Sequence, residues 1–294
     1  MQAGPLSEKI VHLFDEMSEQ LRVAARYVLE RPREVALLTM REQARQADVQ
    51  PATMTRLAKH LGFAGYDDVR QLYADAMRQE GTGFAGRVGA QTQSQKLKGD
   101  HALASDMLSG IGAQLAALAQ PAVLDSLVAG ARRIESARKI YCLGLRSSHS
   151  AAWHLHYTLA LAGRQSVMLD AIGGIGADTL GSATRDDILV AVSVLPYTRQ
   201  TIEITDYARS LGVPVIAITD SRVAPLAMSA AITLVVPTES PSFLHTMSPA
   251  FVIAEILGAL VAGRSGDAAR AALARVDRQS AALNTHLEIR GKRP

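Results

Sequence analysis

Apolar residues recur every three or four positions through the first eighty residues, the spacing of amphipathic helices that pack on one another. Arg31-Pro32 is expected to end the first helix, because proline biases the preceding residue away from helical backbone. This part of the chain is therefore predicted to be an all-α domain over residues 1–80. Its helices are expected over Leu6–Glu30, Leu37–Ala47, Pro51–His60 and Tyr66–Arg78.

The second and third of these helices carry end signals of their own. Thr39 stands in a capping position with Glu42 three residues later, which predicts a capping box. Pro51 suits the first turn of a helix, and Gly62 suits the residue after its end. Two short helices joined by a tight turn, with Val49 expected to be buried in the turn, form a helix-turn-helix pattern. The alternative interpretation is an ordinary helical hairpin.

In a helix-turn-helix the second helix enters the major groove of DNA. Arg56 is the best candidate to contact a guanine edge or a phosphate. Thr53 and Thr55, on the same helix, could form hydrogen bonds to phosphate oxygens or to the backbone. Residues 1–80 hold 11 Lys and Arg against 12 Asp and Glu, so bulk charge does not indicate DNA binding and the hypothesis rests on the motif. The outward face is predicted to comprise Gln50, Thr53, Arg56 and Lys59, and Thr55 is added as a DNA-binding candidate.

Residues 81–100 hold five glycines and are predicted to form a linker. Residues 101–294 then form the second predicted domain, which begins with helices over His101–Leu118 and Pro121–Ala131.

From residue 139 onward, short apolar runs alternate with helical segments at the spacing of βαβ units. This predicts an α/β domain with a five-stranded parallel sheet and helices on both faces. The strands are expected at Lys139–Gly144, Gln165–Asp170, Asp187–Ser193, Val213–Thr219 and Ala230–Val236. The helices are expected at Ser148–Ala162, Ile172–Gly181, Arg199–Leu211, Ala224–Ser229, Met247–Ala262 and Ala268–Leu287.

Two predicted strand ends supply polar groups to one edge of this sheet. Ligands of parallel sheets bind outside the carboxyl ends of the strands, where helix N-termini offer free backbone N–H groups to anions. Hydroxyls and guanidiniums placed there suit a carboxylate or a phosphate, although hydroxyls at such turns can also serve only as helix caps. The candidate effector-binding residues are Arg146, Ser147, Ser148, Ser193, Tyr197, Thr198 and Arg199.

Composition narrows the class of protein further. The chain has 294 residues, 48% of them hydrophobic, with a net charge of +3 and one cysteine. These values predict a globular protein of a reducing compartment. No signal peptide and no transmembrane run is recognised, so a cytoplasmic location without membrane association is expected.

The sequence gives weaker support to a metal site or a catalytic site. The spacings of His149, His154 and His156 place no two of them as ligands on one helix face, so no metal site is predicted. Glu203 and Glu255 could act as acid or base, but neither is paired with a second carboxylate by position. No nucleophile elbow is present. No catalytic residue and no cofactor are therefore predicted.

The motifs resemble those of RpiR/MurR-type transcriptional regulators, which join a helix-turn-helix domain to a sugar isomerase (SIS) domain. The resemblance is strongest over Thr53–Leu57 and Leu61–Tyr66, and it is also good over Ile140–Ser148. It implies that Thr53, Arg56 and Lys59 contact DNA. It further implies that Ser148, Ser193 and Thr198 contact the effector.

Two loops depart from the pattern of that family. Arg146 replaces the second glycine of a Gly-x-Gly-x-Ser loop, and Leu195 and Pro196 replace the inner Ser-Gly of a Ser-x-Ser-Gly-x-Thr loop. The second change removes a hydroxyl and a backbone donor. These changes weaken the phosphate cradle, while Arg146 and Arg199 add positive charge. The effector is therefore still expected to be an anion, either a phosphosugar or a metabolite that carries a carboxylate.

The leading hypothesis is a DNA-binding transcriptional regulator controlled by a small anionic metabolite, without enzymatic activity. Operator DNA is the expected partner, together with a homodimer or homotetramer, because one helix-turn-helix reads too few bases. An isomerase or lyase acting on sugar phosphates through Glu203 or Glu255 is the enzymatic alternative. A protein-interaction adaptor is a third.

Overall fold

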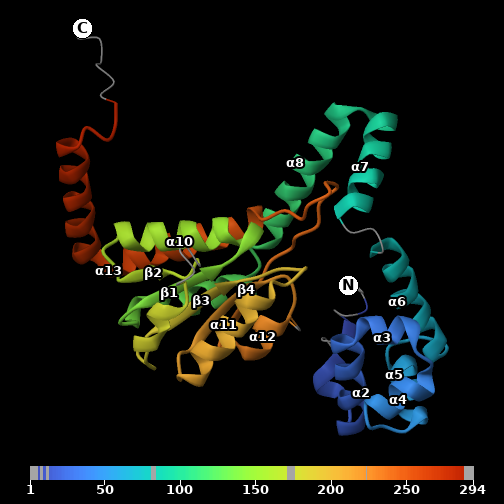
Figure 1. Ribbon diagram of the computed structural model, residues 1–294. Helices are drawn as coiled ribbons and strands as arrows, with labels where there is room; N and C mark the ends of the chain where they lie inside the picture. Colours follow the sequence, from blue (N-terminus) through green and yellow to red (C-terminus); the bar gives the residue numbers. More distant parts are fainter. Residues whose placement is uncertain are drawn as a thin grey trace. The chain divides into compact units, whose positions relative to one another are not determined.

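The computed structural model of the chain describes residues 6, 9–10, 13–80, 84–170, 176–222 and 224–287 (Figure 1). The chain divides into two compact units, which are described separately. The N-terminal unit comprises Met1–Met107 with Ser240–Leu244, and the C-terminal unit comprises Leu108–Glu239 with His245–Pro294. The predicted division at residues 80 and 100 stays a prediction.

The N-terminal unit is helical around one core. Val28, Leu57 and Val69, from three different helices, are fully buried in it. Between residues 13 and 80 its elements are the 3₁₀ helix η1 (Phe14–Glu16) and the helices α2 (Glu19–Glu30), α3 (Pro32–Leu37), α4 (Met40–Gln46), α5 (Pro51–His60) and α6 (Tyr66–Glu80).

Two predictions for this unit are wrong in detail. The predicted continuous helix Leu6–Glu30 is broken, because Met17 and Ser18 are extended between η1 and α2 and this turns Met17 into the core. The predicted helix Leu37–Ala47 is α4, which begins at Met40 after its cap Thr39. A separate helix, α3, was not predicted and begins at Pro32, because proline is compatible with a first helical turn.

The predicted helix ends are confirmed. Thr39 and Glu42 form the capping box, in which the Glu42 N–H donates to Thr39 Oγ1 at 3.3 Å and the Thr39 N–H donates to Glu42 Oε2 at 3.0 Å. The Thr39 hydroxyl holds the pKa of Glu42 below its ordinary value. Gly62 adopts a positive φ of 81° after α5, and the Phe63 N–H closes the helix end on the Ala58 carbonyl at 2.9 Å.

The glycine-rich segment predicted as a linker is helical over α7 (Phe84–Lys98), and α8 (Asp100–Ala117) follows it. Alanine, glutamine and lysine dominate α7, and their helix propensity outweighs the cost of Gly86 and Gly89 inside it. Neither α7 nor α8 has a buried residue.

The C-terminal unit is built on the predicted five-stranded sheet, which is parallel throughout. The strand order is β2-β1-β3-β4-β5, and Tyr141 of β1 pairs with Val167 of β2 on one side and Leu189 of β3 on the other. The strands are β1 (Ile140–Gly144), β2 (Ser166–Met168), β3 (Ile188–Val192), β4 (Val215–Thr219) and β5 (Ile232–Val235).

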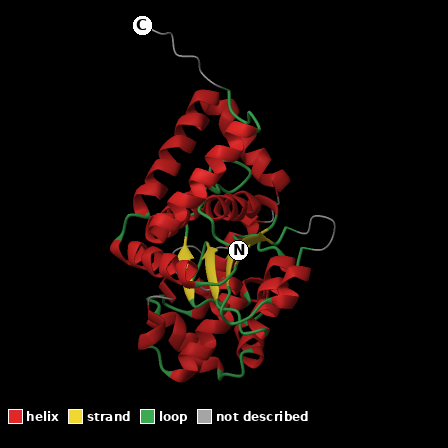
Figure 2. Ribbon diagram, turned by 90° about the vertical axis from the view of Figure 1, so that its left-hand side faces the viewer, coloured by secondary structure: helices red, strands yellow, loops and turns green. Residues whose placement is uncertain are grey.

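Helices cover both faces of this sheet, as predicted (Figure 2). Alternate residues of β1 enter different cores: Ile140 and Cys142 pack in one hydrophobic cluster, Tyr141 and Leu143 in the other. The first cluster is completed by α9 (Pro121–Ser136), α10 (His149–Leu161) and α13 (Ser248–Ala282). The second is completed by α11 (Arg199–Ser210) and α12 (Pro225–Ser229).

The segment after β2 differs from its prediction. A helix was expected over Ile172–Gly181, but residues 171–175 lie outside the described part of the chain, and the remainder forms the 3₁₀ helix η4 (Asp178–Ser182).

α13 runs through both predicted C-terminal helices, with a kink at Gly266, whose φ is 50°. By length and composition α13 could cross a membrane. Among the other described helices, α8 and α9 are long and apolar enough only when they are counted together as one bent span. In this fold α13 packs against α9 and α10 and buries Ile253, Leu257 and Val261 completely. It therefore acts as a core helix of the C-terminal unit.

Candidate functional site

The turn between α4 and α5 brings the two helices of the predicted helix-turn-helix together. Asp48 adopts a positive φ of 52°, and the Val49 N–H donates to the Ala44 carbonyl at 2.9 Å, which ends α4 tightly. Val49 packs against the core but is only partly buried, so the prediction that it would be buried is only partly right.

α5 turns one basic face outward. Gln50, Arg56 and Lys59 are exposed, as predicted, and α5 contains no acidic residue. Its opposite face buries Met54, Leu57 and Ala58 and fixes the helix on the domain. A positively charged helix surface on a rigid scaffold is suited to a phosphate backbone and to base edges.

The predicted outward position of Thr53 is wrong. Its side chain is only 2% exposed, because Thr53 lies one helical turn before the buried Leu57 and shares its face. The Thr53 hydroxyl accepts a hydrogen bond from Arg56 Nη2 at 3.2 Å, so Thr53 orients Arg56. Thr55 is partly buried and donates to Met40 Sδ at 3.5 Å.

Gln43, which the sequence analysis did not single out, supports this helix pair from within. It is completely buried, and its Nε2 donates to the carbonyls of Val35 at 3.0 Å and Leu38 at 2.9 Å. Its Oε1 accepts from the Tyr66 hydroxyl at 2.7 Å. Burial raises the pKa of Tyr66, which keeps the phenol protonated as a donor. One side chain thus ties α3, α4 and α6 together.

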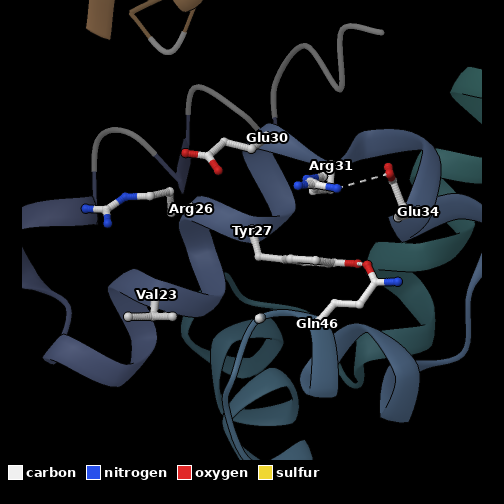
Figure 3. A pocket seen from close by; sticks show the side chains of 8 residues that line it. Val23, Arg26, Tyr27, Glu30, Arg31, Glu34 and Gln46 are labelled. Atoms are coloured by element: carbon white, nitrogen blue, oxygen red, sulfur yellow. Dashed lines mark hydrogen bonds and ion pairs between the residues drawn. The ribbon is translucent and has the colours of Figure 1, made fainter.

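A surface cavity of about 420 Å³ lies beside α2 and the end of α4 (Figure 3). The Tyr27 hydroxyl donates to Gln46 Oε1 at 2.7 Å at its base, and burial raises the Tyr27 pKa. Its two arginines are offset by two glutamates, one of which, Glu34, pairs with Arg31 at 3.6 Å. None of the predicted DNA-binding residues lines it. This charge balance is unsuited to a phosphate backbone.

The strand order of the sheet marks the place in the C-terminal unit where a ligand is expected to bind. β1 and β3 are neighbours, but the chain continues from β1 to β2 on one side and from β3 to β4 on the other. The connections after β1 and β3 therefore diverge at the carboxyl ends of these strands, and this position, here called the crevice, is where parallel sheets bind ligands. The predicted effector residues occupy these two connections, 145–148 and 193–199.

The loop after β1 turns unusually tightly. A Cβ on Gly144 would lie 2.6 Å from the Ser148 carbonyl oxygen and 2.8 Å from Ala152 Cβ, so only glycine fits there. Arg146 is exposed and has a positive φ of 55°, the conformation that glycine would adopt without strain. Ser148 is 5% exposed and stands at the N-cap of α10.

Ser147 has a partner from a distant part of the chain. Its Oγ lies 2.8 Å from Nε2 of His245, which precedes α13 and was not predicted as a site residue. The predicted serine is thus held in place by an imidazole, and the two side chains form one polar group on this side of the crevice.

The loop after β3 is held by a carboxylate that the sequence analysis also missed. Asp220, at the end of β4, accepts the Leu195 N–H on Oδ2 at 3.2 Å and the Tyr197 hydroxyl on Oδ1 at 2.9 Å. Burial, together with the Asp220 charge, raises the pKa of Tyr197. The phenol is therefore a permanent donor.

The other predicted residues of this loop differ in accessibility. Ser193 is 2% exposed, Thr198 is partly buried at the N-cap of α11, and Arg199 is exposed on the first turn of that helix. The peptide bond between Leu195 and Pro196 is cis.

The histidines near the crevice make separate contacts. His149 Nε2 lies 3.8 Å from Asp170 Oδ2, and His156 Nδ1 lies 2.8 Å from Ser166 Oγ. Burial lowers the pKa of His156 and raises that of the neighbouring Cys142 to about 12. Within the residues that the structure describes, no group of three His, Cys, Asp or Glu side chains is placed to hold a metal ion.

The two glutamates of the enzymatic alternative lie apart in the fold. Glu203 is on α11 and Glu255 is on α13, helices that cover opposite faces of the sheet, and both are exposed. Within one chain, therefore, neither glutamate is placed beside the other.

Comparison with known proteins identifies both parts of the chain. Residues 5–80 match the helix-turn-helix domain of the rpiR family, and residues 133–279 match the SIS domain. The chain belongs to the rpiR family. The predicted RpiR-type architecture, a helical domain followed by an SIS domain with a five-stranded parallel sheet, is confirmed.

Solved structures show the same fold. The sugar isomerase domain of an RpiR transcription factor from Sphaerobacter thermophilus is 27% identical, with a TM-score of 0.56, and the match covers 60% of this chain and 98% of that one. The NanR protein of Vibrio vulnificus, complexed with ManNAc-6P, is 22% identical, with a TM-score of 0.52 over 95% of this chain and 98% of that one.

Curated relatives are longer proteins. The bifunctional protein glk of Burkholderia thailandensis and that of Paraburkholderia xenovorans are each 27% identical over 231 residues, which is 77% of this chain. The match spans 34% of their own length, so this rpiR-family chain corresponds to about a third of each.

Proposed function

We propose that this rpiR-family chain is a DNA-binding transcriptional regulator whose SIS domain binds a small anionic effector between the loops after β1 and β3. The observation that carries the proposal is the outward face of α5. It offers Arg56 and Lys59 without any acidic residue on the helix, and its other face is anchored in the core. The matched helix-turn-helix domain and the RpiR transcription factor among the similar structures support a regulator.

The DNA contacts divide by chemistry. Arg56 is the residue to read a guanine edge, since a guanidinium can bond O6 and N7 together. Lys59 and Thr55 contact phosphates, and Gln50, at the N-cap of α5, contacts a base or the backbone. Thr53 acts as a positioning residue through its hydrogen bond to Arg56.

On the effector side, Arg146, Ser147 and Ser148 lie on one edge of the crevice. Ser193, Tyr197, Thr198 and Arg199 lie on the other. Two helix N-termini, those of α10 and α11, also open at this edge and favour an anion.

The effector would control DNA binding through the way in which the subunits assemble. The regulator acts in the cytoplasm as a homodimer or homotetramer, because paired recognition helices are needed for operator specificity. An effector that binds two subunit arrangements with different affinity shifts the population between them and changes the spacing of the recognition helices.

Fluorescence anisotropy on the DNA upstream of the protein's own gene tests the proposal, at two salt concentrations and against unrelated DNA. Arg56→Ala is expected to weaken specific binding by about 1–3 kcal/mol, roughly five- to 150-fold. Arg26→Ala removes the same charge from the exposed part of α2, outside the predicted DNA-binding face, and is expected to leave specific binding unchanged. Equal loss in both variants would refute the assigned role of α5.

The same assay, repeated with sugar phosphates and sugar acids, tests the effector. An anion that changes operator affinity in the wild type supports the crevice assignment if Arg146→Ala suppresses the change. Absence of specific DNA binding under all conditions would refute the regulator.

A further inference from the structure

Asp220 gives the two sides of the crevice different chemistry. Its carboxylate lies at the end of β4, beside the loop that follows β3. One oxygen accepts the Leu195 N–H at 3.2 Å, and the other accepts the Tyr197 hydroxyl at 2.9 Å. The Thr219 hydroxyl adds a third contact, 3.3 Å from Oδ1.

These contacts are the ones that a bound anion would make. A backbone N–H at a strand end and a hydroxyl just before a helix N-terminus are typical donors to phosphate. Here both already donate to a negative charge that belongs to the chain. Pro196, between them, has no N–H to offer. The donors between Leu195 and Tyr197 are therefore used within the protein.

On the opposite side of the crevice, neither Arg146 nor Ser147 contacts a carboxylate in the described part of the chain, and Asp170 lies 3.8 Å from His149 Nε2. Ser147 is paired with the imidazole of His245, and Arg146 is exposed with a guanidinium fork that can bind either a carboxylate or a phosphate. A carboxylate carries a single charge, whereas phosphate at neutral pH carries up to two. Repulsion from Asp220 therefore penalises a phosphate group more strongly.

We propose that Asp220 is a built-in anion that closes the β3 side of the crevice to phosphate, so that the effector's acidic group is a carboxylate held on the β1 side. This inference rests on the proposed effector site and adds its ligand class. Asp220 acts as a specificity-determining residue, because it repels one class of ligand and occupies the donors which that class needs.

Titration with inorganic phosphate, followed through the Leu195 amide by ¹H–¹⁵N NMR, tests the inference without DNA. In the wild type the Leu195 amide signal is expected not to move with phosphate. Asp220→Asn keeps the side-chain shape and one acceptor oxygen but removes the charge. It is expected to raise the affinity for phosphate by about tenfold or more and to make the Leu195 signal respond.

Asp206→Asn is the matched control, because it removes one negative charge from the exposed side of the adjacent α11. It is expected to gain no phosphate affinity. A wild-type Leu195 amide that responds to phosphate and saturates, or an Asp220→Asn variant that folds and gains nothing, would overturn the inference. If Asp220→Asn does not fold, the wild-type titration decides alone.

Ligand class is then checked with two sugars that differ at one carbon. Glucuronate and glucose 6-phosphate share a pyranose ring and differ in the acid that they carry. Preference for the phosphate in the wild type would overturn the inference, whereas a preference that moves toward the phosphate in Asp220→Asn supports it. Failure of the regulator proposal is seen separately, as wild-type protein that does not bind its operator.

Discussion

Gly144 offers a sharp test of how the turn between β1 and α10 is packed. β1 ends at this residue, and the chain turns back over it to begin α10, so that the space beside its Cα is filled. A Cβ added there would lie 2.6 Å from the Ser148 carbonyl oxygen, 3.0 Å from the Ser148 carbonyl carbon and 2.8 Å from Ala152 Cβ. Two of these atoms are backbone and the third is fixed to the helix, so Gly144→Ala forces the strand end and the helix apart.

Two free-energy terms with opposite signs decide the outcome of Gly144→Ala. Overpacking of a well-filled site costs about 1–3 kcal/mol. Restricting the unfolded chain by replacing glycine recovers about 0.4–1 kcal/mol. The first term prevails, because no flexible side chain can give way, and a net loss of roughly 1–2 kcal/mol is expected. In a unit of this size that lowers the melting temperature by about 2–4 °C per kcal/mol.

Urea denaturation followed by tryptophan fluorescence measures this loss of stability in the C-terminal unit, which contains Gly144. Trp153 is the single tryptophan of the chain, and it lies on α10, stacked on Tyr157 at 5.2 Å. Gly110→Ala in α8 is the control, since no atom lies within 4 Å of its added Cβ, and roughly 0.5–1 kcal/mol of stabilisation is expected there. A Gly144→Ala protein as stable as the wild type would refute the close-packed turn.

Two further predictions concern the buried polar groups of each unit. Gln43→Leu removes the acceptor of the Tyr66 hydroxyl and the amide donor to the Val35 carbonyl. It is expected to lower the free energy of unfolding by about 2–5 kcal/mol, as measured by circular dichroism melting. A melt unchanged from the wild type would contradict the buried network. Burial lowers the pKa of His156 below its ordinary value of 6.5, so the unfolded chain takes up this proton more readily. The stability present above about pH 6.5 is therefore expected to fall as the solution is acidified, and His156→Asn should weaken this dependence in urea titrations, whereas His60→Asn on the exposed side of α5 should not.

The sheet could be predicted from the sequence because its strands are buried on both faces. Such strands form short continuous apolar runs, as in Ile188–Val192, and the helices between them set a regular spacing. The helical predictions failed where one feature of the sequence masked another. Apolar periodicity continues in phase through the break at Met17, and the glycines of residues 81–100 concealed a helix whose other residues favour that state.

The predicted effector site stays a prediction, and the structure adds two partners that the sequence did not indicate. The two loops follow directly from strand ends, and any parallel sheet brings such ends to one edge. Asp220 and His245 contact these loops across 25 and 98 residues of sequence, and no local pattern marks them. Thr53 was misplaced because a polar residue suggests an exposed position, whereas its neighbour one turn later, Leu57, defines a buried face.

The two sides of the proposed effector site would orient a ligand that carries one acidic group. Arg146 holds a positive φ of 55°, a conformation that costs a residue other than glycine about 1–2 kcal/mol. Backbone strain of this kind persists where the surrounding structure imposes it, and it is found preferentially at ligand sites. An exposed guanidinium follows β1, whereas the carboxylate of Asp220 follows β4 and holds the loop after β3. A ligand with one acidic end can then satisfy both sides in a single orientation, with its acid toward β1 and its hydrogen-bond donors toward Asp220.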